Sequence, residues 1–322
     1  MAQVEGAHST YDEPIATGGN REDLSDVLFD VSPTETPFIT AIKKNKATAT
    51  SHDWLVDELE DPAENAHIEG DDAAPVEAAS RNRLANYTQI FKKHAVVTGT
   101  QEKVLKGGGI KSEMAYQVAR RLKEIKRDAE LAFIGVANAR VAGDDSTPRE
   151  LGSFETYMTE ETYFGGAGFV APTGNGADVA TPGTPRPLTE DIFTDALEVL
   201  WNNSGGNENI MGLVGSHVKG VISTFVGSAT RYVSTEDKKL VASINVYDGD
   251  FHTVTMAPDR YSSPDSLYFI DAEYVKAADL RGVTAKDLAV TGDSTRKEIV
   301  WETTLEICNP LAHIQVAALE TS

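Results

Sequence analysis

The sequence contains one cysteine, Cys308, among its 322 residues. A single thiol excludes an intramolecular disulfide and a zinc site built from cysteine ligands, and we expect Cys308 to be a small core residue. Long apolar runs are absent too, because no stretch approaches the ~20 apolar residues that span a bilayer. The first residues, Met1–Gly6, show neither the basic patch nor the apolar run of a signal peptide. We therefore expect a soluble protein of the cytoplasm without a membrane partner.

Basic residues are scarce as well. The chain has 29 Lys and Arg against 50 Asp and Glu, which gives a formal net charge of −21. This balance argues against a protein that coats nucleic acid by neutralising phosphates. It also disfavours adhesion to an anionic membrane surface. A content of 40% hydrophobic and 25% charged residues is typical of a globular chain, long enough here for one large domain or two smaller ones.

The charge is unevenly distributed along the chain. Residues 1–80 hold 18 acids and four bases, a net of −14, whereas residues 81–127 hold 12 bases and three acids, a net of +9. Segregation this sharp predicts that one part of the chain meets an oppositely charged part of itself or of a copy. The alternative is a set of solvated faces that never meet.

The amino-terminal part is an acidic arm followed by a long hairpin. Residues 1–23 are polar without periodicity, and apolar residues at helical spacing follow from Leu24 to Val31. Two strand-like runs, 47–57 and 84–98, are separated by an acidic stretch without an apolar pattern. A connection of this length is unexpected inside a compact domain. We interpret it as the acidic tip of a hairpin that reaches a neighbour.

The clearest helix follows three glycines. Ser112 is a good N-cap, and apolar residues recur at steps of three and four until about Arg140. Such a helix would span ~40 Å and act as a scaffold. Residues 143–188, rich in Gly, Thr and Pro, indicate a long excursion. A second helix from Thr189 and a region of mainly strands after Leu240 complete an α+β chain. The core stripe predicted for the long helix is Met114, Val118, Leu122, Ile125 and Phe133.

Patterns that carry chemistry are missing. Ile110 stands where a phosphate loop needs Gly before Lys111. Ser216 follows a strand and opens a helix, but the outer glycines of a nucleophile elbow are absent. The seven histidines are scattered and show no metal-binding spacing. We therefore expect no catalytic, cofactor or metal site.

The order of elements resembles the major capsid proteins of tailed bacteriophages, whose fold encapsulin shells share. In one branch of these proteins a Thr-Pro-Phe element precedes a Trp-x-x-Asp strand, and this chain has Thr36-Pro37-Phe38 before Trp54-Leu55-Val56-Asp57. The branch usually has Gly where His252 stands. The segments that carry the resemblance are Asp23–Leu28, Pro33–Phe38, Trp54–Leu59, Val246–Val254, Leu280–Arg281, Leu288–Asp293 and Trp301–Glu306.

The resemblance implies a division of the chain into the parts of that fold. These are an N-terminal arm (1–46), an extended loop (47–106) with its acidic tip (59–80), a peripheral domain (107–188) with a spine helix (112–140), an axial domain (189–295) and closing strands of the peripheral domain (296–322).

The implied function is self-assembly into the hexamers and pentamers of an icosahedral virion head around double-stranded DNA, with assembly in the host cytoplasm. The implied partners are many copies of the chain and weakly contacted DNA, with portal, scaffold and decoration proteins as further candidates. The alternatives are an encapsulin-like shell that stores an enzyme cargo and an acidic cytosolic hydrolase that uses Ser216 or a carboxylate pair. The candidate interface residues are Trp54, Asp57, Glu58, Asp71, Asp72, Arg81, Arg83, Lys92 and Lys93.

Overall fold

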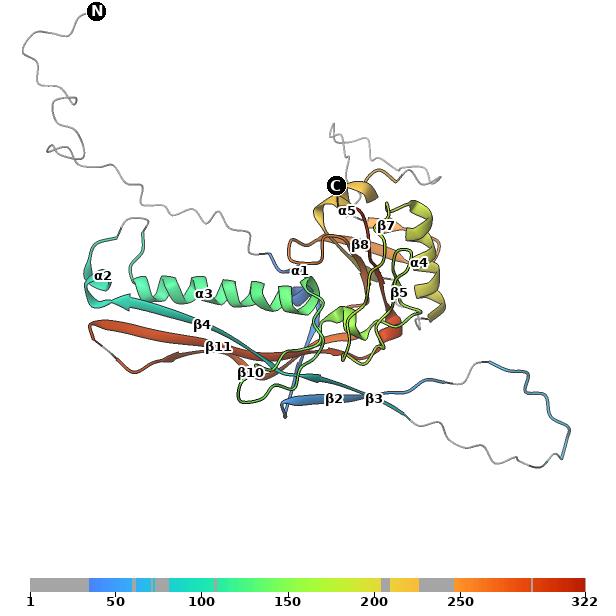
Figure 1. Ribbon diagram of the computed structural model, residues 1–322, viewed down its shortest axis with the longest axis horizontal. Coiled ribbons are helices and arrows are strands. Elements are labelled where there is room, and N and C mark those ends of the chain that lie inside the picture. Colours follow the sequence, from blue (N-terminus) through green and yellow to red (C-terminus); the bar gives the residue numbers. More distant parts are fainter. Residues whose placement is uncertain are drawn as a thin grey trace, which may run out of the picture.

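The computed structural model describes residues 35–59, 62–70, 72, 81–106, 109–203, 209–225, 246–290 and 292–321. Residues 1–34 of the predicted arm, with the predicted helix at 24–31, lie outside these ranges. Within them the chain is α+β, as expected, and two sheets share one continuous hydrophobic core. Figure 1 shows a long helix and a long-stranded sheet running side by side, a second sheet at one end, and a hairpin that extends away from both.

The first sheet has four strands in the order β1-β10-β11-β4. β11 is antiparallel to both of its neighbours, and β1 pairs with β10 in parallel. Helix α3 packs along this sheet against β4 and β11. The strands are β1 Lys43–Lys46, β4 Gln89–Thr98, β10 Val275–Asp287 and β11 Ser294–Ile307.

The spine helix is shorter than predicted. α3 covers Glu113–Glu130 and continues as one π-helical turn, Leu131–Gly135, after which Val136 is extended. Its start is as expected, because the Ser112 side chain accepts a hydrogen bond from the Ala115 backbone N–H. The end is set by packing, since a Cβ on Gly135 would overlap the carbonyl oxygen of Tyr261. Periodicity alone does not detect such a tertiary contact.

The second sheet has six strands in the order β5-β12-β9-β6-β8-β7. Helices α4 (Glu190–Asn203) and α5 (Ser216–Ile222) pack on it and share a cluster of buried residues with it. The strands are β5 Tyr163–Phe164, β6 Asn209–Val214, β7 Val246–Asp248, β8 Thr253–Pro258, β9 Leu267–Ile270 and β12 His313–Val316.

The two sheets do not follow the predicted chain divisions. β10 lies in the four-stranded sheet, although residues 189–295 were assigned to the axial part. β12 lies in the six-stranded sheet, although residues 296–322 were assigned to the peripheral part. Strand pairing over long sequence separations decides both memberships, and the domain bounds themselves stay a prediction.

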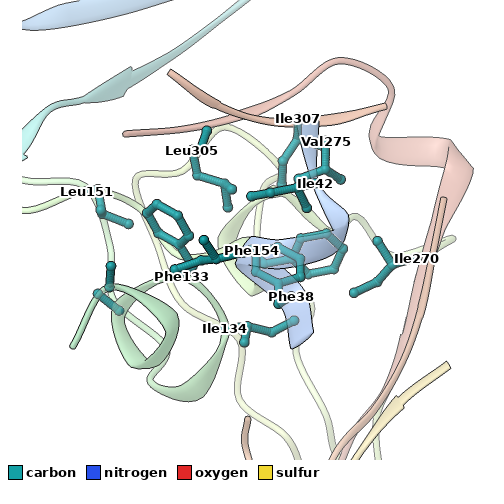
Figure 2. Close-up of a cluster of buried hydrophobic side chains, with 14 of the residues drawn as sticks. Phe38, Ile42, Phe133, Ile134, Leu151, Phe154, Ile270, Val275, Leu305 and Ile307 are labelled. Carbon is teal, nitrogen blue, oxygen red and sulfur yellow. The ribbon is translucent and has the colours of Figure 1, made fainter. Parts of the chain in front are cut away.

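The Gly- and Pro-rich region 143–188 is not a surface excursion throughout. A 3₁₀ turn, Phe154–Tyr157, lies in the middle of the main core, and the side chains of Phe154 and Tyr157 are fully buried. Helix α1 (Pro37–Ala41) places Phe38 edge-on against both Phe133 and Phe154. Figure 2 shows these three rings meeting beside aliphatic side chains from the two sheets. The irregular segment therefore forms part of the centre of the fold.

The predicted hairpin is present as a separate two-stranded sheet. β2 (Ser51–Val56) and β3 (Asn82–Tyr87) are antiparallel, and β2 has no other strand partner among the described residues. The predicted strand 84–98 divides at Thr88, where the chain leaves the hairpin and enters β4. A short helix, α2 (Gly99–Lys103), and a 3₁₀ turn, Pro310–Ala312, are the remaining helical elements of the described residues.

Candidate assembly surfaces

The base of the hairpin is anchored by Trp54. Its indole N–H donates a hydrogen bond of 2.8 Å to the carbonyl oxygen of Ile307 in β11. Its ring lies 5.7 Å, centroid to centroid, from that of Tyr157. A Trp that is held in this way by its own subunit orients the hairpin. Trp54 is therefore a support for the candidate interface within the subunit.

Asn86 fixes the second strand of the hairpin to the body. Its buried amide donates to the carbonyl oxygens of Gly152 (3.1 Å) and Leu305 (2.9 Å), and its oxygen accepts from the backbone N–H of Gly152 at 2.8 Å. The hydroxyl of Tyr157 adds a hydrogen bond of 2.8 Å to the carbonyl of Ala85. Buried polar groups with full sets of partners hold one geometry, so the hairpin leaves the body in a defined direction.

Glu302 joins three segments below the hairpin. Its side chain is 4% exposed and accepts hydrogen bonds from Arg149 at 2.6 Å and Arg281 at 2.5 Å. The hydroxyl of Thr88, where the chain leaves the hairpin, donates to the same carboxylate at 3.1 Å. Two guanidinium groups around one buried carboxylate compensate its desolvation. The junction between β3 and β4 is thereby tied to β10 and β11.

A second buried carboxylate, that of Glu306 in β11, is bonded to side chains of β1, β2 and β10. It accepts from Asn45 of β1 at 2.6 Å, from His52 of β2 at 2.9 Å and from Lys276 of β10 at 3.1 Å. Burial alone would raise the pKa of Glu306, but these donors and the Cys308 thiol hold it at about 2. Glu306 is therefore ionised throughout the neutral range.

The basic candidates for the interface have partners within their own subunit. Arg81 lies 3.5 Å from Asp57, and Lys93 lies 2.7 Å from Asp128. Arg83 pairs with Asp53, and Lys92 pairs with Glu298. The Arg81 and Arg83 side chains remain 68% and 69% exposed, so these pairs are worth little to the fold. The four bases can still contact a neighbouring subunit, but each of them already has an acidic partner in its own subunit.

The acidic candidates point to solvent where the structure describes them. Asp57, Glu58 and Asp72 are exposed, as are residues 62–70 of the tip, while Asp71 lies outside the described residues. Two large apolar side chains of this segment, Leu59 (98% exposed) and Ile68 (85%), have no cover from the described part of the subunit. Exposed apolar groups on a projecting hairpin are typical of a contact surface.

The structure buries part of the predicted core stripe of the spine helix. Met114, Ile125 and Phe133 are buried, and Val118 is partly buried against the core. Leu122 is 39% exposed, so its assignment to the core was wrong. Leu122 instead borders a groove between α3 and β10.

Glu130 has a structural role that the sequence pattern missed. It falls on the polar face of the helix, yet it is fully buried and caps α1, accepting from the backbone N–H groups of Phe38 and Ile39. Thr36, the N-cap residue of α1, makes no capping hydrogen bond. Burial, opposed by the two N–H donors and helped by the charge of Asp259, raises the pKa of Glu130 to about 7. Pro37 signals a helix start, but no local pattern indicates an acceptor so distant in sequence.

The described residues contain no arrangement that points to catalysis. Ser216 is exposed at the first position of the short helix α5, a place that suits a helix start as well as it suits a nucleophile. No group of three or more His, Cys, Asp or Glu side chains could hold a metal ion in the part of the chain that the structure covers. Among the same residues, no helix has the length and hydropathy that crossing a bilayer requires.

Comparisons with known proteins confirm the resemblance that the sequence suggests. The major capsid protein of Escherichia phage Phieco32 is 26% identical over 339 residues, which is 94% of this chain and 94% of that protein. The capsid of a native GTA particle has a TM-score of 0.63 at 13% identity, covering 94% of this chain and 95% of the other. The capsid of cyanophage A-1(L) has a TM-score of 0.63 at 12% identity, covering 96% and 99%.

The structural matches show the fold, which is that of tailed-phage capsid proteins. A family model described as SU10 major capsid protein matches residues 7–320. Because this match extends over nearly the whole sequence, the chain belongs to the SU10 major capsid protein family and is a structural protein of a phage capsid.

Proposed function

We propose that this capsid protein assembles as hexamers and pentamers into an icosahedral head that encloses double-stranded DNA. The observation that carries the assembly mode is the β2–β3 hairpin, which extends from the body while its base is held by Trp54, Asn86 and Glu302. An isolated two-stranded hairpin is marginally stable in water. A hairpin with a fixed base and an exposed tip is therefore suited to be completed by a neighbouring subunit.

The stability of such a shell would come from many modest contacts. Each subunit offers its hairpin to one neighbour and receives another, so every contact is repeated by the symmetry of the assembly. Once some contacts have formed, the others form at a high effective concentration. Weak ion pairs at Arg81 and Arg83 would then set the register between subunits more than the affinity.

Contact with packaged DNA is proposed to be weak. A chain with a net charge of −21 repels phosphates over most of its surface. The basic face of α3 is the exception, although Arg120 and Arg121 both pair with Glu124. Lys123 adds an exposed base on the same helix. We propose that this face makes the salt-sensitive DNA contact, and that portal, scaffold or decoration proteins are further partners in the virion.

Both alternative functions are less well supported. The family match favours a phage capsid over a shell that stores an enzyme cargo, and purified native particles would decide between the two by holding DNA or protein. A hydrolase using Ser216 finds no support in the sequence, where the outer glycines of a nucleophile elbow are replaced by Leu213 and Val218. The variant Ser216→Ala should therefore form particles like the wild type.

The assembly proposal can be tested by removing the hairpin tip. Deletion of residues 60–78, with a short Gly-Ser bridge, should leave a folded subunit that fails to form stable shells in electron micrographs. A variant with residues 60–78 in scrambled order keeps the length and charge and serves as the matched control for specific contacts. Normal shells from the deletion variant would overturn the role of the hairpin.

A further inference from the structure

An apolar groove lies between the spine helix and the four-stranded sheet. It has a volume of about 240 Å³ and is lined by Ile39, Lys44, Leu122, Ile125, Lys126, Ala277, Asp279, Val283 and Trp301. Six of these nine side chains are apolar, and three, Lys44, Lys126 and Asp279, are charged. The groove therefore favours an apolar occupant.

The apolar side chains at the mouth of the groove are exposed to solvent, whereas those in its floor are buried. Leu122 is 39% and Val283 48% exposed, whereas Ile125 and Trp301 in the floor are 1% and 6% exposed. The polar atoms of the floor already have partners, since the indole N–H of Trp301 donates to Asp279 at 2.7 Å. What remains for an occupant to cover is the apolar mouth.

The rim of the groove is basic. Lys44 and Lys126 line it, and Lys123 is exposed next to Leu122 on α3. Asp279 contributes the acidic side chain of the lining, and its carboxylate is engaged by Trp301. An occupant with apolar side chains on one face and acidic side chains on the other would fit this surface.

The segment 22–31 of the chain has this character. Four of its five apolar residues, Leu24, Val27, Leu28 and Val31, recur at helical spacing, while Phe29 falls beside this stripe. The same segment contains four acids and no base: Glu22, Asp23, Asp26 and Asp30. Ile39, in α1, is itself a lining residue of the groove. Val31 stands five positions before Thr36, the N-cap residue of α1, and extended chain of that length covers as much as ~17 Å. Leu122 and Lys126 lie only ~6 Å apart along the helix axis, so the segment can reach the groove of its own subunit.

We propose that, in the unassembled subunit, residues 22–31 dock as an amphipathic helix into the groove of the same chain. The apolar face covers Leu122 and Val283, and the acidic face meets the lysines of the rim. Docking within one chain needs no second subunit and proceeds at the high effective concentration that a short connection provides.

The proposal is tested by disulfide trapping in the full-length chain. In a Cys308→Ser background, Leu28→Cys and Leu122→Cys are combined, and subunits diluted below the assembly concentration are oxidised with diamide. Asp26→Cys with Leu122→Cys is the matched control, because residue 26 lies on the opposite side of a helix from residue 28. We expect the Leu28 pair to crosslink at least ~10-fold faster than the control, consistent with a free-energy preference of about 1.4 kcal/mol.

Isotope mixing then identifies which chain supplies the segment. Equal amounts of light and ¹⁵N-labelled subunits are oxidised together, and the crosslinked peptides are analysed by mass spectrometry. Docking within one chain gives only light–light and heavy–heavy pairs. Mixed pairs would assign the groove to the arm of a second copy and overturn the proposal, as would equal crosslinking rates for the two cysteine positions. Shell formation by the unoxidised protein, seen by electron microscopy, reports separately on the capsid function.

Discussion

The carboxylate of Glu130 accepts a hydrogen bond of 2.7 Å from the backbone N–H of Phe38, which stands 92 positions earlier in the chain. With the second bond from Ile39 at 2.8 Å, it completes the first turn of α1 and holds that helix against the end of the spine helix. Glu130 is thus one of the contacts that join α1 to the body of the subunit.

The pH dependence of stability should reveal this acid. The pKa of Glu130 is raised to about 7 in the fold, against an ordinary value of 4.5 for the unfolded chain. Its contribution is therefore complete below about pH 4.5 and is lost as the pH rises through about 7. Relative to Glu130→Gln, the wild type should lose on the order of 2 kcal/mol of unfolding free energy between about pH 5 and about pH 8. Urea titrations of both proteins measure this, and parallel pH profiles would contradict it.

Glu306 should show the opposite dependence. Its pKa of about 2 in the fold lies below the usual 4.5, so its contribution is complete above about pH 4.5 and is lost as the pH falls toward about 2. We expect the wild type to exceed Glu306→Gln by about 2–3 kcal/mol at about pH 7, and the difference to shrink steadily below about pH 4.5. Acid titrations followed by circular dichroism compare the two. A constant difference from neutral pH down to about pH 3 would exclude this role for the network.

Asn86 should be the most sensitive residue of the hairpin base. Its removal leaves the N–H of Gly152 and two carbonyl groups without their partner, so Asn86→Ala should cost about 2–4 kcal/mol. Asn82, exposed at the start of the same strand, is the matched control, and Asn82→Ala should change stability by less than ~0.5 kcal/mol. Hydrogen exchange should show faster opening of β2 and β3 in the first variant alone. Similar effects of both substitutions would argue against an anchored base.

The fold was predictable from the sequence where local patterns dominate, and less so where distant segments meet. Ser112 and the spacing after it predicted the start of α3, and the acidic stretch after Trp54 predicted the hairpin. The close approach of Gly135, in the π-helical turn after α3, to Tyr261 and the capping of α1 by Glu130 both join segments that are distant in the sequence. Phe154 and Tyr157 sit in a Gly- and Pro-rich region whose composition resembles a loop, although tertiary packing places them in the core. The sequence suggested the four bases as interface candidates, but it did not indicate which acids they pair with inside the subunit.

The role of the four bases between subunits can be tested by charge reversal. Reversing Arg81, Arg83, Lys92 and Lys93 to Glu should slow assembly, and more so at about 50 mM than at about 500 mM salt, because screening weakens charge pairing between exposed groups. Light scattering follows the assembly rate. The double exchange Asp53→Arg with Arg83→Asp restores the pair inside the subunit while inverting the charge at each position. If Arg83 acts between subunits, the exchange variant assembles more slowly than the wild type at low salt. Assembly at the wild-type rate would assign Arg83 to its pair inside the subunit alone.

Gly135 should tolerate no side chain. A Cβ there would overlap the carbonyl oxygen of Tyr261 and lie 2.6 Å from a methyl carbon of Leu131, and backbone cannot yield as a flexible side chain can. Gly135→Ala should therefore cost at least ~2 kcal/mol. Gly220, inside α5, is the matched control, because a Cβ added there would meet nothing within 4 Å. Gly220→Ala should be neutral or stabilise by up to ~1 kcal/mol through helix propensity.

Thermal and urea unfolding of both alanine variants separate the effect of this close approach from that of glycine in general. The difference between them isolates the contact with Tyr261, since each substitution adds the same methyl group and removes the same backbone freedom from the unfolded chain. Equal stability of the two variants would mean that the π-helical turn can move away from the loop around Tyr261, and that the end of the spine helix is not fixed by this contact.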